Sequence, residues 1–109
     1  MFRRSIDDQS QERELPELLD EEEIEQRCDE LGDWEREGDQ IQKVFEFDDF
    51  TTAIKFVDDV ARLAERYDHH PDIDIRYSRV RLALSTHSEG GLTERDFDFA
   101  GEIEQSIET

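Results

Sequence analysis

Residues 48–67 read DDFTTAIKFVDDVARLAERY, and this stretch decides the fold class. Its apolar residues recur three and four positions apart, which is the period of an amphipathic α-helix. One stripe contains Phe50, Ile54, Val57, Ala61 and Ala64, and an adjacent stripe contains Phe56, Val60, Leu63 and Tyr67. Asp48 or Asp49 can cap the N-terminus, and Pro71 disfavours helix at His70. The apolar face is wide enough to cover a sheet and also to contact a partner chain.

Two predicted hairpins flank this helix. Before it, Gly38 and Asp39 supply turn residues, and residues 41–47 alternate mostly with a period of two. After it, residues 72–77 (DIDIRY) and 79–87 (RVRLALSTH) read as two strands around a tight turn. In the last strand Val80, Leu82 and Leu84 point to one face, and Arg81, Ala83 and Ser85 point to the other. Hairpins imply an antiparallel sheet.

Two further helices complete the pattern. Asp20 followed by Glu23 resembles a capping box, and Gly32 is placed to end that helix. Thr93 caps the last helix, whose inner stripe is Phe97, Ala100, Ile103 and Ile107. We therefore predict an α+β fold in the order α-β-β-α-β-β-α, with a four-stranded antiparallel sheet and three helices packed on one face. We expect a mobile N-terminal extension over residues 1–14 and a single domain over residues 15–109.

The composition is strongly acidic, with 32 Asp and Glu residues against 13 Lys and Arg residues and a formal net charge of -19. An acidic tail or a nucleic-acid mimic would account for such a charge, but the acids are spread along the chain. This favours a solvated acidic shell in a salt-rich cell, where screening relaxes self-repulsion. We expect no direct nucleic-acid binding, because no basic patch is present to neutralise phosphates. No apolar run suits a bilayer or a secretory signal, so we expect a soluble, cytoplasmic protein.

The three histidines of the chain, His69, His70 and His87, lie close to predicted element ends. Imidazole titrates near neutrality, so one histidine can accept a proton while another donates one. A metal site using His69, His87 and Asp96 is an alternative, although the chain has no clustered ligand motif. A Ser85–His87–Asp96 nucleophilic triad is a weaker one, because no nucleophile elbow is present.

At these residues the sequence resembles the pterin-4a-carbinolamine dehydratase family. The signature consists of Glu65, three residues, His69-His70-Pro71, five residues, Tyr77, nine residues, His87, eight residues and Asp96. The stretches FEFDDFTTAIKF, YSRVRLALSTH and GGLTERD also resemble the family. Ile73 departs from it, because animal members often carry an aromatic residue there.

The resemblance implies a hydro-lyase, 4a-hydroxytetrahydrobiopterin dehydratase, which converts a 4a-hydroxytetrahydropterin to the quinonoid dihydropterin without a metal or other cofactor. It implies that His69 and His87 are the catalytic acid–base groups and that His70 chiefly binds the pterin. It further implies that the substrate site is lined or oriented by Glu65, Asp68, Ser85, Thr86 and Asp96.

Two other functions remain open at this point. One is a pterin-binding, dimerisation or coactivator module, because animal relatives stabilise transcription-factor dimers through a helical surface. The other is a relative that acts on a pterin of molybdopterin or folate metabolism. The wide helix face and the exposed sheet edges further predict a homodimer or homotetramer.

Overall fold

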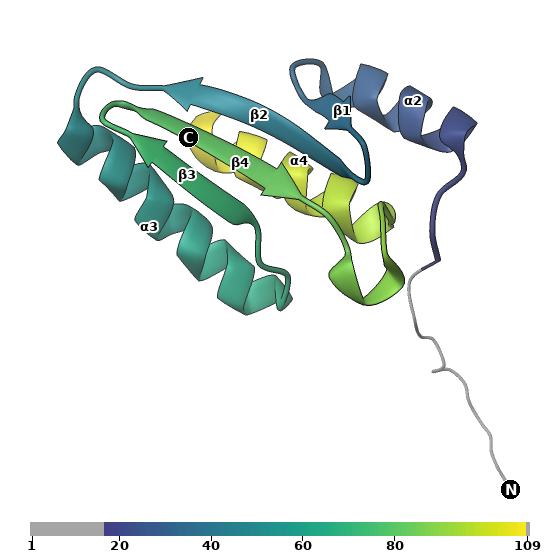
Figure 1. Cartoon of the computed structure of the whole chain (residues 1–109). Coiled ribbons are helices and arrows are strands. Elements are labelled where there is room, and N and C mark those ends of the chain that lie inside the picture. The colour runs from purple at the N-terminus through teal and green to yellow at the C-terminus, as the bar shows by residue number, and fades with distance from the viewer. Residues whose placement is uncertain (1–16, 109) are drawn as a thin grey trace, which may run out of the picture.

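The computed structural model describes residues 17–108, and these form one antiparallel sheet with helices on one face (Figure 1). The elements in chain order are α2 (Glu21–Leu31), β1 (Glu35–Glu37), β2 (Gln40–Glu46), α3 (Phe50–Tyr67), β3 (Asp72–Arg76), β4 (Arg79–Leu84), the 3₁₀ turn η1 (His87–Glu89) and α4 (Glu94–Glu108). The predicted α+β class, the four antiparallel strands and the three helices are confirmed. The extension expected over residues 1–14 lies outside the described residues.

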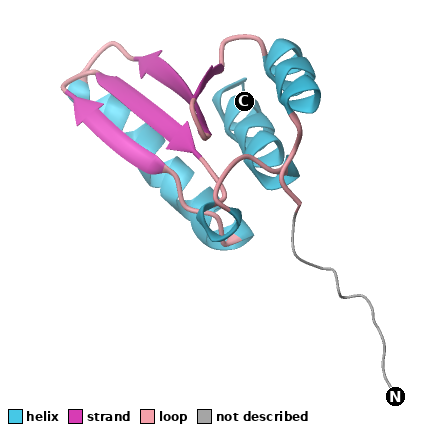
Figure 2. Ribbon diagram, turned by 45° about the vertical axis from the view of Figure 1, so that its right-hand side comes forward, coloured by secondary structure: helices cyan, strands magenta, loops and turns pink. Residues whose placement is uncertain are grey.

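The sheet has the strand order β1-β2-β4-β3, so the two hairpins meet through β2 and β4. Ile41 pairs with Leu84 and Phe45 pairs with Val80 across this central junction. All four side chains are buried, which places them on the face that the helices cover. Figure 2 shows the helices behind this face and the opposite face open. The period-two pattern therefore predicted the correct faces of both central strands.

The core lies between the sheet and the helices. Trp34 is 2% exposed and its indole N–H donates to Glu104 Oε2 at 2.9 Å. Lys43 Nζ lies 2.6 Å from the same Glu104 oxygen, so one carboxylate of α4 satisfies two polar groups at the edge of the core. Phe45 and Phe56 pack with their ring centroids 4.8 Å apart, which joins β2 to α3.

Helix α3 begins where its capping residue predicts. Asp49, rather than Asp48, is the N-cap, and its Oδ1 accepts from Thr52 N–H at 2.8 Å. This hydrogen bond lowers the pKa of the Asp49 carboxyl below its ordinary value, because it stabilises the charged form.

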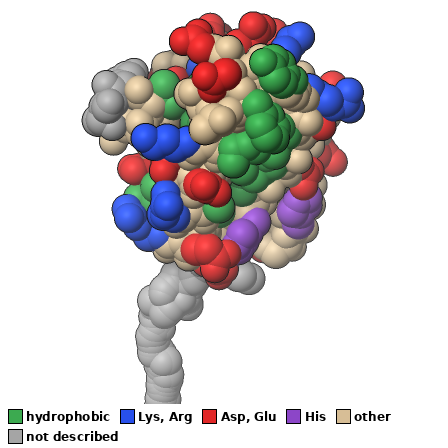
Figure 3. All heavy atoms as spheres, turned by 90° about the vertical axis from the view of Figure 1, so that its left-hand side faces the viewer, with side chains coloured by type: hydrophobic (Ala, Val, Ile, Leu, Met, Phe, Trp, Pro, Cys, Tyr) green, Lys and Arg blue, Asp and Glu red, His purple; other side chains and the backbone are tan. Residues whose placement is uncertain are grey.

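The two predicted apolar stripes of α3 do not divide into a buried one and an exposed one. The buried residues are Ala53, Phe56, Val60 and Ala64, so the buried face takes Phe56 and Val60 from the second stripe and Ala64 from the first. Phe50 is 48% exposed and Tyr67 is 42% exposed. A continuous hydrophobic patch is visible on this side of the molecule (Figure 3). The predicted excess of apolar surface on this helix is therefore present.

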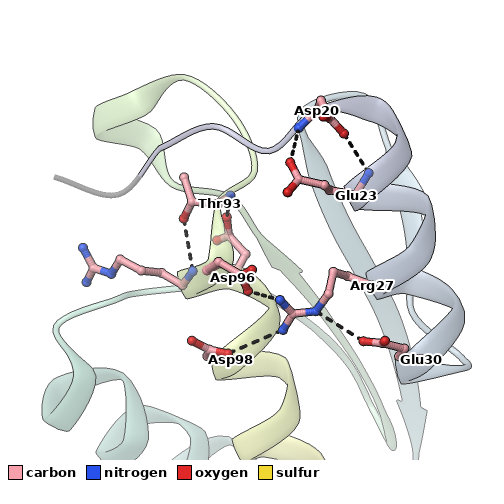
Figure 4. Close-up of polar contacts among 9 residues, drawn as sticks. Asp20, Glu23, Arg27, Glu30, Thr93, Asp96 and Asp98 are labelled. Atoms are coloured by element: carbon pink, nitrogen blue, oxygen red, sulfur yellow. Dashed lines mark hydrogen bonds and ion pairs between the residues drawn. The ribbon is translucent and has the colours of Figure 1, made fainter.

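The outer helices match the prediction with one correction. The Asp20–Glu23 capping box is formed, with Glu23 N–H donating to Asp20 Oδ1 at 2.8 Å (Figure 4). In α4 the inner stripe was wrong at its end, because Ile107 is 42% exposed. Phe99, which was not predicted, is 2% exposed and packs beside Tyr67. Ile107 lies in the last turn of α4.

Within residues 17–108, the helices are too short or too polar to cross a membrane.

Candidate active site

Three segments that are distant in the sequence meet at the first turn of α4. His69 follows the C-terminal end of α3, Thr86 lies between β4 and η1, and Asp96 belongs to α4. The His69 Nε2 atom lies 2.6 Å from Asp96 Oδ1. His69 is 7% exposed and Asp96 is 0% exposed. The fold therefore joins a buried imidazole to a buried carboxyl group.

The second oxygen of Asp96 is held by two threonines. Asp96 Oδ2 accepts from Thr93 N–H at 2.9 Å and from the Thr86 hydroxyl at 2.8 Å. The two threonine hydroxyl oxygens lie 2.7 Å apart. Because Thr86 donates its hydrogen to Asp96, the Thr93 hydroxyl is the donor in that pair. Thr93 Oγ1 in turn accepts from Arg95 N–H at 3.2 Å, so each side-chain oxygen of Thr86, Thr93 and Asp96 has a hydrogen-bond partner.

This direction of hydrogen bonding assigns the two nitrogens of His69. A carboxylate accepts hydrogen bonds and donates none, so His69 is the donor to Asp96 Oδ1 and carries a proton on Nε2. The Nδ1 atom is then the nitrogen that remains to accept a proton. A carboxylate that fixes the tautomer of an imidazole in this way is a common device of acid–base sites.

The end of α3 explains how two adjacent histidines separate. Asp68 adopts a left-handed conformation with φ of 51°, and its N–H donates to Ala64 O. The next N–H, that of His69, also donates to Ala64 O, at 3.1 Å. This reversal turns the chain toward β3, with His69 inward against the edge of Phe99 and His70 outward.

His70 forms a pair at the surface. Its Nε2 atom lies 2.7 Å from Glu65 Oε2, one helical turn back on α3. The side chains are 56% and 78% exposed, respectively. Figure 3 shows histidine side chains on the surface, next to the hydrophobic patch. The Glu65–His70 pair is therefore accessible to a ligand, and solvent weakens its electrostatic energy.

Ser85 and His87 line a surface pocket. A pocket of about 270 Å³ is lined by Ser85, His87, Gly90 and three residues of the β1–β2 hairpin, Glu37, Asp39 and Gln40. Thr86, between Ser85 and His87, points inward to Asp96 and anchors this corner to the buried cluster. Asp96 is bonded to His69 and not to His87, so the Ser85–His87–Asp96 triad is not formed. Among residues 17–108, no three His, Cys, Asp or Glu side chains are grouped as metal ligands.

Seven of the eight predicted site residues fall into three sets. His69, Thr86 and Asp96 are in contact, Glu65 and His70 are paired, and Ser85 and His87 share a pocket. Asp68, the eighth, has a left-handed main-chain conformation, and its carbonyl oxygen accepts a hydrogen bond from Arg95.

Sequence reasoning missed three residues of this region. Thr93 was assigned only to helix capping, although its spacing from Asp96 is that of a capping box. Phe99 packs on the His69 ring with the centroids 5.9 Å apart. Arg95 lies in the GGLTERD stretch, but the sequence predicts no role for it, because its side chain binds main-chain carbonyls of another helix.

The chain is similar to known proteins in sequence and in fold. Residues 17–106 match the family described as pterin 4 alpha carbinolamine dehydratase. A relative from Acidobacterium capsulatum, named as a candidate pterin-4-alpha-carbinolamine dehydratase, is 58% identical over 81 residues, which cover 74% of this chain and 88% of the relative. A relative from Roseiflexus castenholzii with the same name is 52% identical over 90 residues, which cover 83% and 97%.

A solved structure shares the fold. It is described as a transcriptional coactivator/pterin dehydratase from Brucella melitensis. It superposes with a TM-score of 0.77 at 37% identity, over 81% of this chain and 96% of that chain.

Proposed function

Because this chain belongs to the pterin 4 alpha carbinolamine dehydratase family, we propose that it dehydrates a 4a-hydroxytetrahydropterin to the quinonoid dihydropterin. In this reaction a proton is donated to the 4a-hydroxyl oxygen, the C4a–O bond breaks and water leaves. A ring nitrogen loses a proton, and its electron pair forms the new double bond. The enzyme must therefore supply one proton donor and one proton acceptor on a bound, bicyclic substrate.

His69 and His87 are the acid–base groups in this proposal. His69 Nε2 is held by Asp96, so proton exchange with the substrate takes place at Nδ1. His87 lies at the surface, where it exchanges protons with water between turnovers. Positioned acid–base groups contribute typically about 10² to 10⁴-fold each. His70, held by Glu65, binds the pterin, and Asp68, Ser85 and Thr86 line or orient the site.

The buried His69–Asp96 pair is the observation that carries this proposal. A buried carboxylate is costly unless it is fully hydrogen-bonded, and Asp96 is surrounded by three donors. Buried, hydrogen-bonded pairs of an imidazole and a carboxylate are common at sites of proton transfer.

The test is turnover of 4a-hydroxytetrahydropterin, generated in the assay and followed by absorbance. We expect wild type to accelerate dehydration well above the spontaneous rate. With a variant in which all three histidines are replaced by Ala, we expect the rate of dehydration to equal the spontaneous rate in buffer. Equal rates for wild type, this variant and buffer would refute the activity.

A second copy of the chain is the proposed partner. Phe50 is 48% exposed, and Ile73 and Ile75 on the edge strand β3 are 36% and 37% exposed. Exposed apolar surface and an open strand edge favour self-association, so we propose a homodimer or homotetramer.

A binding module is the second candidate function, and the exposed apolar side chains of Phe50, Ile73 and Ile75 favour it. The Brucella melitensis structure is described as a coactivator as well as a dehydratase. A coactivator role would use the exposed α3 surface and would not depend on the histidines. Loss of turnover in histidine variants with unchanged assembly separates the two functions.

A further inference from the structure

Arg95 holds the main chain immediately before the two histidines. Its Nη2 atom donates to Asp68 O at 2.8 Å and to Tyr67 O at 3.2 Å. The last carbonyls of a helix have no partner within the helix. A cation at this end also interacts favourably with the helix dipole. Arg95 therefore closes the C-terminal end of α3 from the neighbouring helix α4.

The geometry of that corner sets the direction of both imidazoles. Asp68 has a φ of 51°, which is unusual for a residue other than glycine and must be maintained by its surroundings. Immediately after it, His69 turns inward and His70 turns outward. A change at the Tyr67 and Asp68 carbonyls would redirect both side chains.

Arg95 and Asp96 are consecutive residues of α4, and they hold the same corner in different ways. Asp96 binds the His69 ring directly. Nothing equivalent buries the His70 ring, whose bond to Glu65 lies at the surface. The placement of His70 consequently depends on the main chain that precedes it.

We propose that Arg95 is a positioning residue for the His69–His70 pair, acting through the Tyr67 and Asp68 carbonyls. The proposal rests on the proposed dehydratase function, because it assigns Arg95 a part in substrate turnover. Arg95 itself does not touch the reacting atoms in this account. Small misplacements of catalytic groups are costly, so loss of Arg95 is expected to lower kcat/KM by about tenfold to a hundredfold.

The kinetic test compares Arg95→Met with Arg62→Met. Methionine keeps an unbranched side chain but has no donor. Arg62 is a matched control, because its side chain is 71% exposed and forms an ion pair at 2.8 Å with Asp59, one turn earlier in α3. We expect Arg95→Met alone to lose turnover and added guanidinium, far below denaturing concentrations, to restore part of it. Sodium chloride at equal ionic strength should not restore it. Equal kinetics for the two variants, or no guanidinium rescue, would overturn the proposal.

A second measurement does not depend on turnover. Long-range ¹H–¹⁵N spectra of the full chain report the imidazole nitrogens without substrate. Arg95→Met should shift or broaden the His70 signals, whereas Arg62→Met should leave them unchanged. If wild type proves inactive but these signals change, the dehydratase function fails while the positioning role stands. If wild type is active and the signals do not change, the positioning role fails. Arg95→Lys, which retains the charge but loses the planar guanidinium group, replaces Arg95→Met if the latter does not fold.

Discussion

Replacing Asp96 by Asn changes the buried pair by one atom, and the network predicts how the protein responds. The oxygen that faces Thr86 and Thr93 accepts two hydrogen bonds, so the Asn carbonyl oxygen must stay on that side. The amide NH₂ then faces His69 and donates to Nε2. This moves the imidazole proton to Nδ1, the nitrogen that is assigned to accept a proton in the proposed mechanism.

The expected magnitudes follow from these contacts. Asp96→Asn replaces a charge-assisted hydrogen bond by a neutral one, so we expect a loss of stability of about 1 to 2 kcal/mol. Turnover should fall by about 10²-fold or more, because one acid–base group carries its proton on the wrong nitrogen. Asp96→Ala leaves three buried donors without an acceptor and should cost about 3 to 5 kcal/mol, a large share of the stability of a small domain.

The assay combines dehydration kinetics, thermal melting and imidazole ¹⁵N shifts for both Asp96 variants. Asp98→Asn is the matched control, because Asp98 belongs to the same helix as Asp96, is 74% exposed and lies 3.5 Å from Arg27 of α2 (Figure 4). We expect the control to match wild type in all three measurements. If Asp96→Asn moves the proton to Nδ1 and turnover stays near that of wild type, the assignment of Nδ1 as the reactive nitrogen is wrong.

Three further predictions test other parts of the molecule. His70→Ala should raise KM more than it lowers kcat, because His70 is assigned to binding; steady-state kinetics showing the opposite split would count against this role. Phe50→Asp should reduce the assembly to a smaller species in light scattering, because it places a charge in the exposed apolar patch; an unchanged mass would exclude that patch as the contact. The melting temperature should rise from low to molar salt, because screening relaxes repulsion in a chain of net charge -19, and a salt-independent melt would end the high-salt interpretation.

Much of the fold was predictable because it depends on local periodicity and capping. The alternation around Phe45 and Val80 fixed which strand faces are buried, and Asp20 and Glu23 marked a helix start. Which apolar residues of α3 are buried was not predictable. Both stripes are apolar, and only packing against the sheet selects Phe56 over Phe50.

The candidate site was predictable in its residues but not in its contacts. The family signature identified His69, His70, His87 and Asp96 as a set. The pairing of Asp96 with His69 depends on how α3 and α4 cross, which no spacing in the sequence encodes. The same is true of Arg95, whose partners are main-chain carbonyls and therefore carry no side-chain signature.

The rate of dehydration by His69→Ala and His87→Ala, each measured against the spontaneous reaction, tests the central claim most directly. The account predicts that both single variants fold and melt cooperatively, yet each loses most of the wild-type acceleration. The double variant should lose little more of the acceleration than the less active of the two single variants, because the two groups act as one unit. Single variants that both keep near wild-type rates would contradict histidine acid–base catalysis, and the binding-module function would then be the better explanation of the site.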